Sequence, residues 1–111
     1  MTYDGHLVSR LRDIFDTHDL GDVTEKKMFG GVAFMVRGHM SCGVTKDSLM
    51  VRVGKEAYES ALTFKGAREM DFTGRPMRGF VHVSQEGFAT RKALEAWVER
   101  SLAFVTSLPP K

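Results

Sequence analysis

The amino-acid sequence predicts an α+β domain: a two-layer α/β sandwich of order α-βββ-α-ββ-α, in which helices pack against an antiparallel five-stranded sheet. Two observations predict this class. Apolar residues recur at helical spacing near both ends of the chain, and they alternate with polar residues through its centre. The chain has 111 residues, which is the usual size of one domain, so residues 1–111 are expected to form a single domain.

The first predicted element is an amphipathic helix over residues 5–18. Leu7, Leu11 and Ile14 return at i, i+4 and i+7, which is the spacing of one helical face. Asp4 precedes them and is a favoured N-cap residue. This pattern indicates a helix that buries one side against the rest of the domain.

Three strands follow, over residues 32–36, 40–44 and 49–53, where apolar and polar residues alternate. Short turns at Arg37-Gly38 and at 45–47 connect them. Because such short connections join only antiparallel neighbours, the three strands are expected to form a meander.

The second half of the chain predicts a short helix over residues 56–63, an extended segment at 70–72 and a strand at 80–84. The last helix is expected to begin after Thr90, a plausible N-cap, and to end before Pro109. These elements complete the predicted order.

Charge is unevenly distributed along the chain. The first 25 residues hold six acidic and two basic side chains, whereas residues 26–111 hold 14 basic and 8 acidic ones. A molecule with two oppositely charged sides can steer partners. The net charge is only +2, which gives no general electrostatic reason to bind nucleic acid.

Composition also indicates the cellular compartment. A single cysteine excludes an internal disulfide, and the first residues lack the apolar run of a secretory signal. The longest apolar run, residues 32–36, is too short to span a bilayer. We therefore expect a cytoplasmic protein without membrane association.

Catalytic chemistry is not predicted. Cys42 falls within a strand on the apolar face, opposite in direction to His39, where a cysteine usually acts as a small hydrophobe. The four histidines lack the spacing of a zinc site. We expect no catalytic residue, no metal and no cofactor, and hence a protein that is not an enzyme.

The consecutive residues Phe29, Gly30 and Gly31 are candidate binding residues. Glycines let the backbone approach an anion closely, but here they precede a strand and not the start of a helix. A bulge or sharp bend is the alternative interpretation of this pair of glycines.

Three arginines are further candidates. Arg75 and Arg78 belong to the densest basic stretch of the chain, and a guanidinium group pairs well with phosphate or carboxylate. A solvated loop is the alternative interpretation. Arg52 is expected on the mixed face of a strand, where it either pairs with an acid such as Glu56 or Glu59 or lines a groove.

Methionine is frequent, with seven in the chain, and Met35 and Met50 fall on the second face of the predicted sheet. Flexible thioether side chains suit adaptable binding surfaces, so this face is a candidate docking surface for a partner or a second subunit. Filling of the core is the equally weighted alternative.

Several of these motifs occur together in one family. They are Lys27-Met28-Phe29-Gly30-Gly31-Val32-Ala33-Phe34, Leu49-Met50-Val51-Arg52-Val53, Phe72-Thr73-Gly74-Arg75-Pro76-Met77 and the Trp97 helix. In this order they resemble the TfoX (Sxy) N-terminal domain family over about residues 10–108. The resemblance implies a secretion-chaperone-like fold with a five-stranded antiparallel sheet. Larger regulators of this type act with a cyclic-AMP-responsive transcription activator at competence promoters, and the family supplies no established catalytic residue.

Together the residues and the resemblance predict a non-enzymatic regulatory domain that acts through protein contacts, as a homodimer or with a partner related to transcription. Direct nucleic-acid binding through the basic residues is one alternative. Binding or conversion of a small anionic ligand is another, and it requires Arg52 and Arg75 to converge in one pocket.

Overall fold

The structure is a computed structural model that describes residues 4–18, 23–28, 31–46, 48–71 and 76–109. Its elements are α1 (Gly5–Asp16), β1 (Val23–Met28), β2 (Gly31–Val36), β3 (His39–Thr45), β4 (Ser48–Arg52), α2 (Lys55–Ala61), β5 (Ala67–Asp71), β6 (Pro76–Val83), the 3-10 turn η1 (Gln85–Gly87) and α3 (Arg91–Val105).

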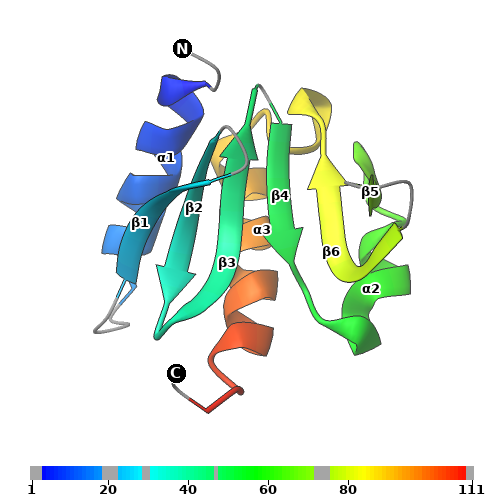
Figure 1. Ribbon diagram of the computed structural model, residues 1–111. Coiled ribbons are helices and arrows are strands. Elements are labelled where there is room, and N and C mark those ends of the chain that lie inside the picture. Colours follow the sequence, from blue (N-terminus) through cyan, green and yellow to red (C-terminus); the bar gives the residue numbers. More distant parts are fainter. Residues whose placement is uncertain (1–3, 19–22, 29–30, 47, 72–75, 110–111) are drawn as a thin grey trace.

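The strands form one antiparallel sheet in the order β1-β2-β3-β4-β6-β5 (Figure 1). Helices α1 and α3 lie against one face of this sheet, and α2 packs beside β6. The predicted α+β class with an antiparallel sheet is therefore confirmed, with six strands in place of the expected five.

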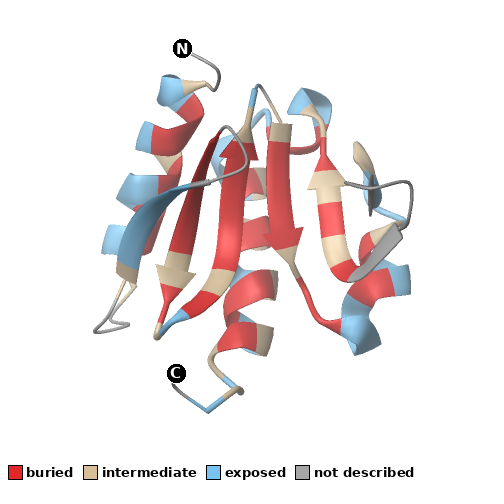
Figure 2. Ribbon diagram, viewed as in Figure 1, coloured by how far each residue is buried: buried red, intermediate tan, exposed pale blue. Residues whose placement is uncertain are grey.

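The additional strand is β1, at one edge of the sheet. Its sequence shows no apolar alternation, because the four consecutive residues from Thr24 to Lys27 are all polar. In the structure all four are exposed (Figure 2). Charged side chains are typical of edge strands, where they discourage pairing with other chains. A strand of this kind has no signature in hydrophobic periodicity, which explains why the sequence did not predict it.

The core lies between the sheet and the helices. The rings of Phe15 in α1 and Phe34 in β2 stack with their centroids 5.0 Å apart. From α3, Leu94, Trp97 and Val98 are at most 2% exposed. This packing fixes α3 across β3 and β4 and so determines where its outer face lies.

Both predicted N-caps are confirmed. The Asp4 carboxylate accepts hydrogen bonds from the amides of His6 and Leu7 at the start of α1, and the Thr90 hydroxyl accepts one from the amide of Ala93. Each cap satisfies amide groups that have no partner within the helix. The last helix thus begins where its sequence predicted.

The turn between β2 and β3 is also as expected. Arg37 and Gly38 both have positive φ angles, 54° and 86°. Two successive positive values are typical of the type I′ turns that connect adjacent antiparallel strands.

A bulge in β3 corrects one expectation about side-chain direction. Phe34 pairs with Cys42, but the next residue, Met35, pairs with Met40, so β3 contains one extra residue. The extra residue reverses the alternation, and His39 therefore faces the helices, as Cys42 does. There the His39 Nε2 atom donates to the Pro109 carbonyl oxygen at 2.6 Å.

A paired hydrogen bond ties the edge strand to α1. The Arg12 guanidinium donates to both carboxylate oxygens of Glu25, at 2.7 and 2.8 Å. This contact lowers the pKa of Glu25, mainly through the hydrogen bond from Arg12. Its stabilisation is therefore present above the unfolded pKa of the carboxyl group and is lost as pH falls through the folded value. Both side chains are solvent-accessible, so the contribution is small.

Gly31, one of the predicted binding residues, has a structural role in the sheet. It is buried at the start of β2, and a Cβ atom added there would collide with the carbonyl group of Val44, with the carbonyl carbon only 2.8 Å away. Backbone atoms cannot move aside without opening the sheet. The glycine thus permits the close approach of β2 and β3.

Replacing Gly31 by alanine is expected to lower the free energy of unfolding by about 1–3 kcal/mol, because the added methyl group overpacks the strand pair. Urea denaturation followed by circular dichroism measures this. An unchanged urea midpoint of unfolding would show that packing does not require glycine at position 31, and Gly31 would again be a candidate binding residue.

Candidate functional site

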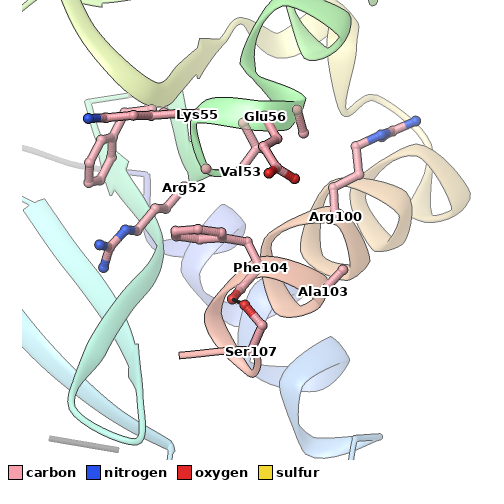
Figure 3. Close-up of a pocket in the computed structure, with 12 residues that line it drawn as sticks. Arg52, Val53, Lys55, Glu56, Arg100, Ala103, Phe104 and Ser107 are labelled. Carbon is pink, nitrogen blue, oxygen red and sulfur yellow. Dashed lines mark hydrogen bonds between the residues drawn. The ribbon is translucent and has the colours of Figure 1, made fainter. Parts of the chain in front are cut away.

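The candidate site is a pocket of about 680 Å³ between α2, α3, the end of β4 and the middle of β6 (Figure 3). This volume lies in the usual range for sites that bind a ligand or an inserted side chain. The lining combines aromatic and small apolar residues with several cations.

Arg52, the last residue of β4, is the predicted site residue that lines this pocket. Its guanidinium carbon lies 5.6 Å from the ring centroid of Phe80 and 5.3 Å from that of Phe104. Phe80 is its cross-strand neighbour on β6. Two aromatic contacts orient the guanidinium while leaving its hydrogen-bond donors available, because the attraction acts on the ring faces. Arg52 was predicted either to pair with an acidic side chain or to line a groove, and the structure shows the second arrangement.

Two glycines shape the backbone beside Arg52. The amides of Val53 and Gly54 both donate to the carbonyl oxygen of Gly79, at 2.8 and 3.1 Å. Gly54 has a φ angle of 85°, and a Cβ atom there would overlap the ring of Phe104. Glycine at this turn therefore allows the Phe104 ring to lie against the backbone and form one wall of the pocket.

Helix α3 contributes the opposite wall. Arg100, Ala103, Phe104 and Ser107 line the pocket at i, i+3, i+4 and i+7, the last of them just beyond the helix end. This spacing places them on one side of the helix, next to the face that enters the core. The helix thus has two functional sides, one that packs and one that is open to the pocket.

Arg100 is held by aromatic contacts as well. Its guanidinium carbon lies 3.9 Å from the ring centroid of Phe64 and 4.9 Å from that of Trp97. Phe64 is 41% exposed, and among the described residues it is the large hydrophobic side chain that reaches the surface. One end of the pocket therefore carries a cation beside an exposed aromatic ring.

The pocket has a positive character. Arg52, Lys55 and Arg100 line it, and among the described residues the only carboxylate in the lining is that of Glu56. The ion pairs found in the described part of the chain join other residues, Arg12 with Glu25 and Arg91 with Glu95. The three cations of the pocket are therefore available to an acidic group from outside.

Among the described residues, Arg52 is the predicted site residue that the pocket contains. Gly31 is not part of the lining. Phe29, Gly30 and Arg75, and the side chain of Arg78, lie outside the described residues, so their predicted binding roles remain predictions.

Sequence reasoning missed Lys55, Phe80, Arg100 and Phe104. A signal existed for the two residues of α3, because their i, i+4 spacing lies beside the apolar stripe and combines a cation with an aromatic ring. No signal in the sequence places them next to Arg52, since the two segments are brought together only by the tertiary fold.

Cys42 lies away from the pocket, in the core. It is completely buried, and burial raises the pKa of its thiol to about 12. Beside it the hydroxyl groups of Ser41 and Ser101 are 2.7 Å apart, and the Ser101 hydroxyl donates to the Ser41 carbonyl oxygen. These contacts join β3 to α3. Cys42 therefore acts as a core residue.

The thiol of Cys42 is expected to react about a thousandfold more slowly with iodoacetamide in the folded protein than in urea, because a pKa of about 12 suppresses the thiolate. The raised pKa also means that stability falls as pH rises above the unfolded thiol pKa of about 9. Mass spectrometry of timed samples measures the reaction. Similar rates in both states would contradict the burial of this thiol.

The second sheet face carries the methionines. Met50 is 1% exposed, whereas Met35 and Met40 are intermediate. The terminal methyl groups of Met40 and Met50 converge over Gly43. Of these three described methionines, Met50 is therefore buried and Met35 and Met40 are partly exposed, and the role of this face as a docking surface remains a prediction.

Two kinds of feature are absent from the described residues. No three His, Cys, Asp or Glu side chains gather there as a metal-binding group. No helix found there has the length and apolar character needed to cross a bilayer.

The fold and the pocket define a two-layer α+β domain with an open antiparallel sheet and a cationic, aromatic-lined recess between two helices. The family model of the TfoX N-terminal domain matches residues 15–105. The chain therefore belongs to the TfoX N-terminal domain family, which confirms the resemblance found in the sequence. No curated protein and no solved structure matches the chain.

Proposed function

We propose that this protein is a non-enzymatic regulatory domain that works through protein contacts, and that the pocket between α2 and α3 is where an acidic partner surface binds. The observation that supports this most is the pair of half-buried arginines, Arg52 and Arg100, each fixed by aromatic rings and without an ion-pair partner among the described residues. Arginine and aromatic side chains are the residues that contribute most to binding energy at protein interfaces.

The chemistry of the lining supports recognition in preference to catalysis. Three cations and the rings of Phe80 and Phe104 line the pocket, with Glu56 as its carboxylate among the described residues. Such a set binds and orients an acidic group, and the Ser107 hydroxyl in the lining donates to the Phe104 carbonyl oxygen and not to Glu56, so it is not activated by that carboxylate. Membership of the TfoX N-terminal domain family favours a regulatory role in transcription.

Site-specific photocrosslinking tests this proposal. A photoreactive amino acid at position 103, which is exposed and lines the pocket, is expected to capture a protein partner in a lysate of the native cells. The same group at position 92 is the control, because it lies at the other end of α3, about 16 Å along the helix axis. Equal capture from both positions would contradict the proposal. So would a crosslinked product whose yield stays the same when Arg52 and Arg100 are replaced.

Fluorescence anisotropy of labelled duplex DNA and single-stranded RNA tests the nucleic-acid alternative. The proposed function predicts no binding at either low or moderate salt. Binding that weakens steeply with salt would instead show phosphate contacts and counterion release. Sedimentation equilibrium adds the oligomeric state and shows whether a second copy of the chain is the partner.

A further inference from the structure

Cationic and apolar groups occupy different parts of the pocket. From this arrangement we infer that the pocket accepts a partner segment in which an apolar side chain lies between two acidic ones. This inference rests on the proposed function and specifies the partner of the same site. Three features carry it, namely the apolar middle of the pocket, the cations at its ends and the position of Glu56.

The middle of the pocket is apolar. Phe104 on α3 lies there, and Val53, Ala57 and Ala103 add further apolar groups to the lining. Figure 3 shows the Phe104 ring projecting from α3 between the flanking charged residues. An apolar side chain inserted there buries its surface against these walls, and removal of apolar surface from water favours binding. This part of the pocket therefore anchors an apolar side chain.

Cations lie at both ends. Arg52 and Lys55 extend on one side of Phe104, and Arg100 extends on the other (Figure 3). Arg100 and Phe104 are one helical turn apart, which is about 6 Å along the axis of α3. The two arginines thus lie on opposite sides of the Phe104 ring. Two acidic groups, one on either side of an apolar residue, can each pair with one of them.

Glu56 refines this pattern. Its carboxylate projects between α2 and α3, where Figure 3 places it between Arg52 and Arg100. An acidic group entering the middle of the pocket is repelled by this carboxylate, whereas an apolar group is not. Glu56 therefore favours acidic groups at the two ends and weakens the binding of any anion that lacks an apolar centre.

The test uses a short fluorescein-labelled peptide with two leucines between two glutamates, titrated with the intact protein at low and moderate salt. Two matched peptides replace both glutamates by glutamine or both leucines by serine. The inference predicts binding of the first peptide, with each change weakening it about tenfold or more, as expected for the loss of charge-assisted hydrogen bonds or of a buried apolar anchor.

Variants of the protein locate the contact. Arg52→Gln and Arg100→Gln are each expected to weaken binding about tenfold, whereas Lys92→Gln, which removes an exposed cation of α3 outside the pocket, leaves it unchanged. Glu56→Gln is expected to strengthen binding about two- to fivefold, because it removes the repelling carboxylate. Thermal melts of each variant show that the fold is retained.

The outcomes separate the two proposals. If the peptide with serines binds as well as the peptide with leucines, or if Glu56→Gln weakens binding, the inferred pattern is wrong. No binding of any peptide at millimolar protein also overturns the inference, while position-103 crosslinking to a protein partner still supports the proposed function. Peptide binding without that crosslinking supports the inference about the pocket and counts against the proposed function.

Discussion

Replacing Trp97 by alanine is expected to lower the free energy of unfolding by about 3–5 kcal/mol, the usual cost of removing a large aromatic side chain from a core. Trp97 is 2% exposed, and its indole nitrogen donates to the Gly87 carbonyl oxygen at 3.1 Å. Its ring also meets Phe64 edge to face, with the centroids 5.7 Å apart. Since the free energy of unfolding of such domains is about 5–15 kcal/mol, the variant retains only a small part of it at the lower end of this range.

The consequence extends to the pocket. Trp97 fixes the middle of α3, and Arg100 lies one turn further along the same helix, with its guanidinium over the Trp97 ring. The Trp97→Ala variant should therefore bind the acidic peptide less well even at temperatures where it stays folded.

Trp97→Phe is the matched control. It keeps most of the apolar volume but leaves the Gly87 carbonyl without the indole donor, at an expected cost of about 1–3 kcal/mol. Urea unfolding followed by circular dichroism compares the two variants. Equal midpoints for alanine and phenylalanine would show that the volume of the Trp97 ring is not what holds α3 in place.

The second large effect is on binding. Reversing both charges, with Arg52→Glu and Arg100→Glu in one chain, is expected to weaken binding of the acidic peptide by about a hundredfold or more, because two attractions become repulsions in a partly buried site. Stability should change little. Each arginine loses its ring contacts, which contribute about 0.5–1 kcal/mol at sites of this exposure.

The control for this variant has the same change in net charge. Lys26→Glu with Lys92→Glu reverses two exposed cations that do not line the pocket. If this control weakens peptide binding as much as the arginine variant does, attraction is general and the pocket is not a specific site. Melting temperatures and anisotropy titrations of both variants provide the comparison.

The sequence predicted most of the fold, and the reasons are physical. The N-cap residue Thr90 and a sustained apolar stripe predict helix α3, and regular apolar alternation predicts the inner strands. No such pattern predicts strand β1, because its polar, exposed residues do not alternate with apolar ones. The bulge at Ser41 in β3 has no sequence signature either, since one extra residue changes the direction of His39 without changing the composition of the strand.

The candidate site was predicted only in part. Alternation between Val51 and Val53 places Arg52 on the mixed face of a strand, which predicts that it pairs with an acid or lines a groove, and it does line the pocket. Phe104, which contacts Arg52, is 52 residues away in the chain and Arg100 is 48 residues away, so their positions around one pocket depend on the crossing of α3 over β4. Periodicity describes each element separately, so it cannot show which outer face of one element meets the end of another.

The most direct test of the account is a single crosslinking comparison. The photoreactive group at position 103 is placed in the wild-type chain and in the Arg52→Glu, Arg100→Glu variant, and protein products are quantified from equal amounts of folded protein. The account predicts a distinct product with the wild type and its loss in the variant. A product of equal yield in both would show that these arginines, and the pocket they define, do not hold the partner.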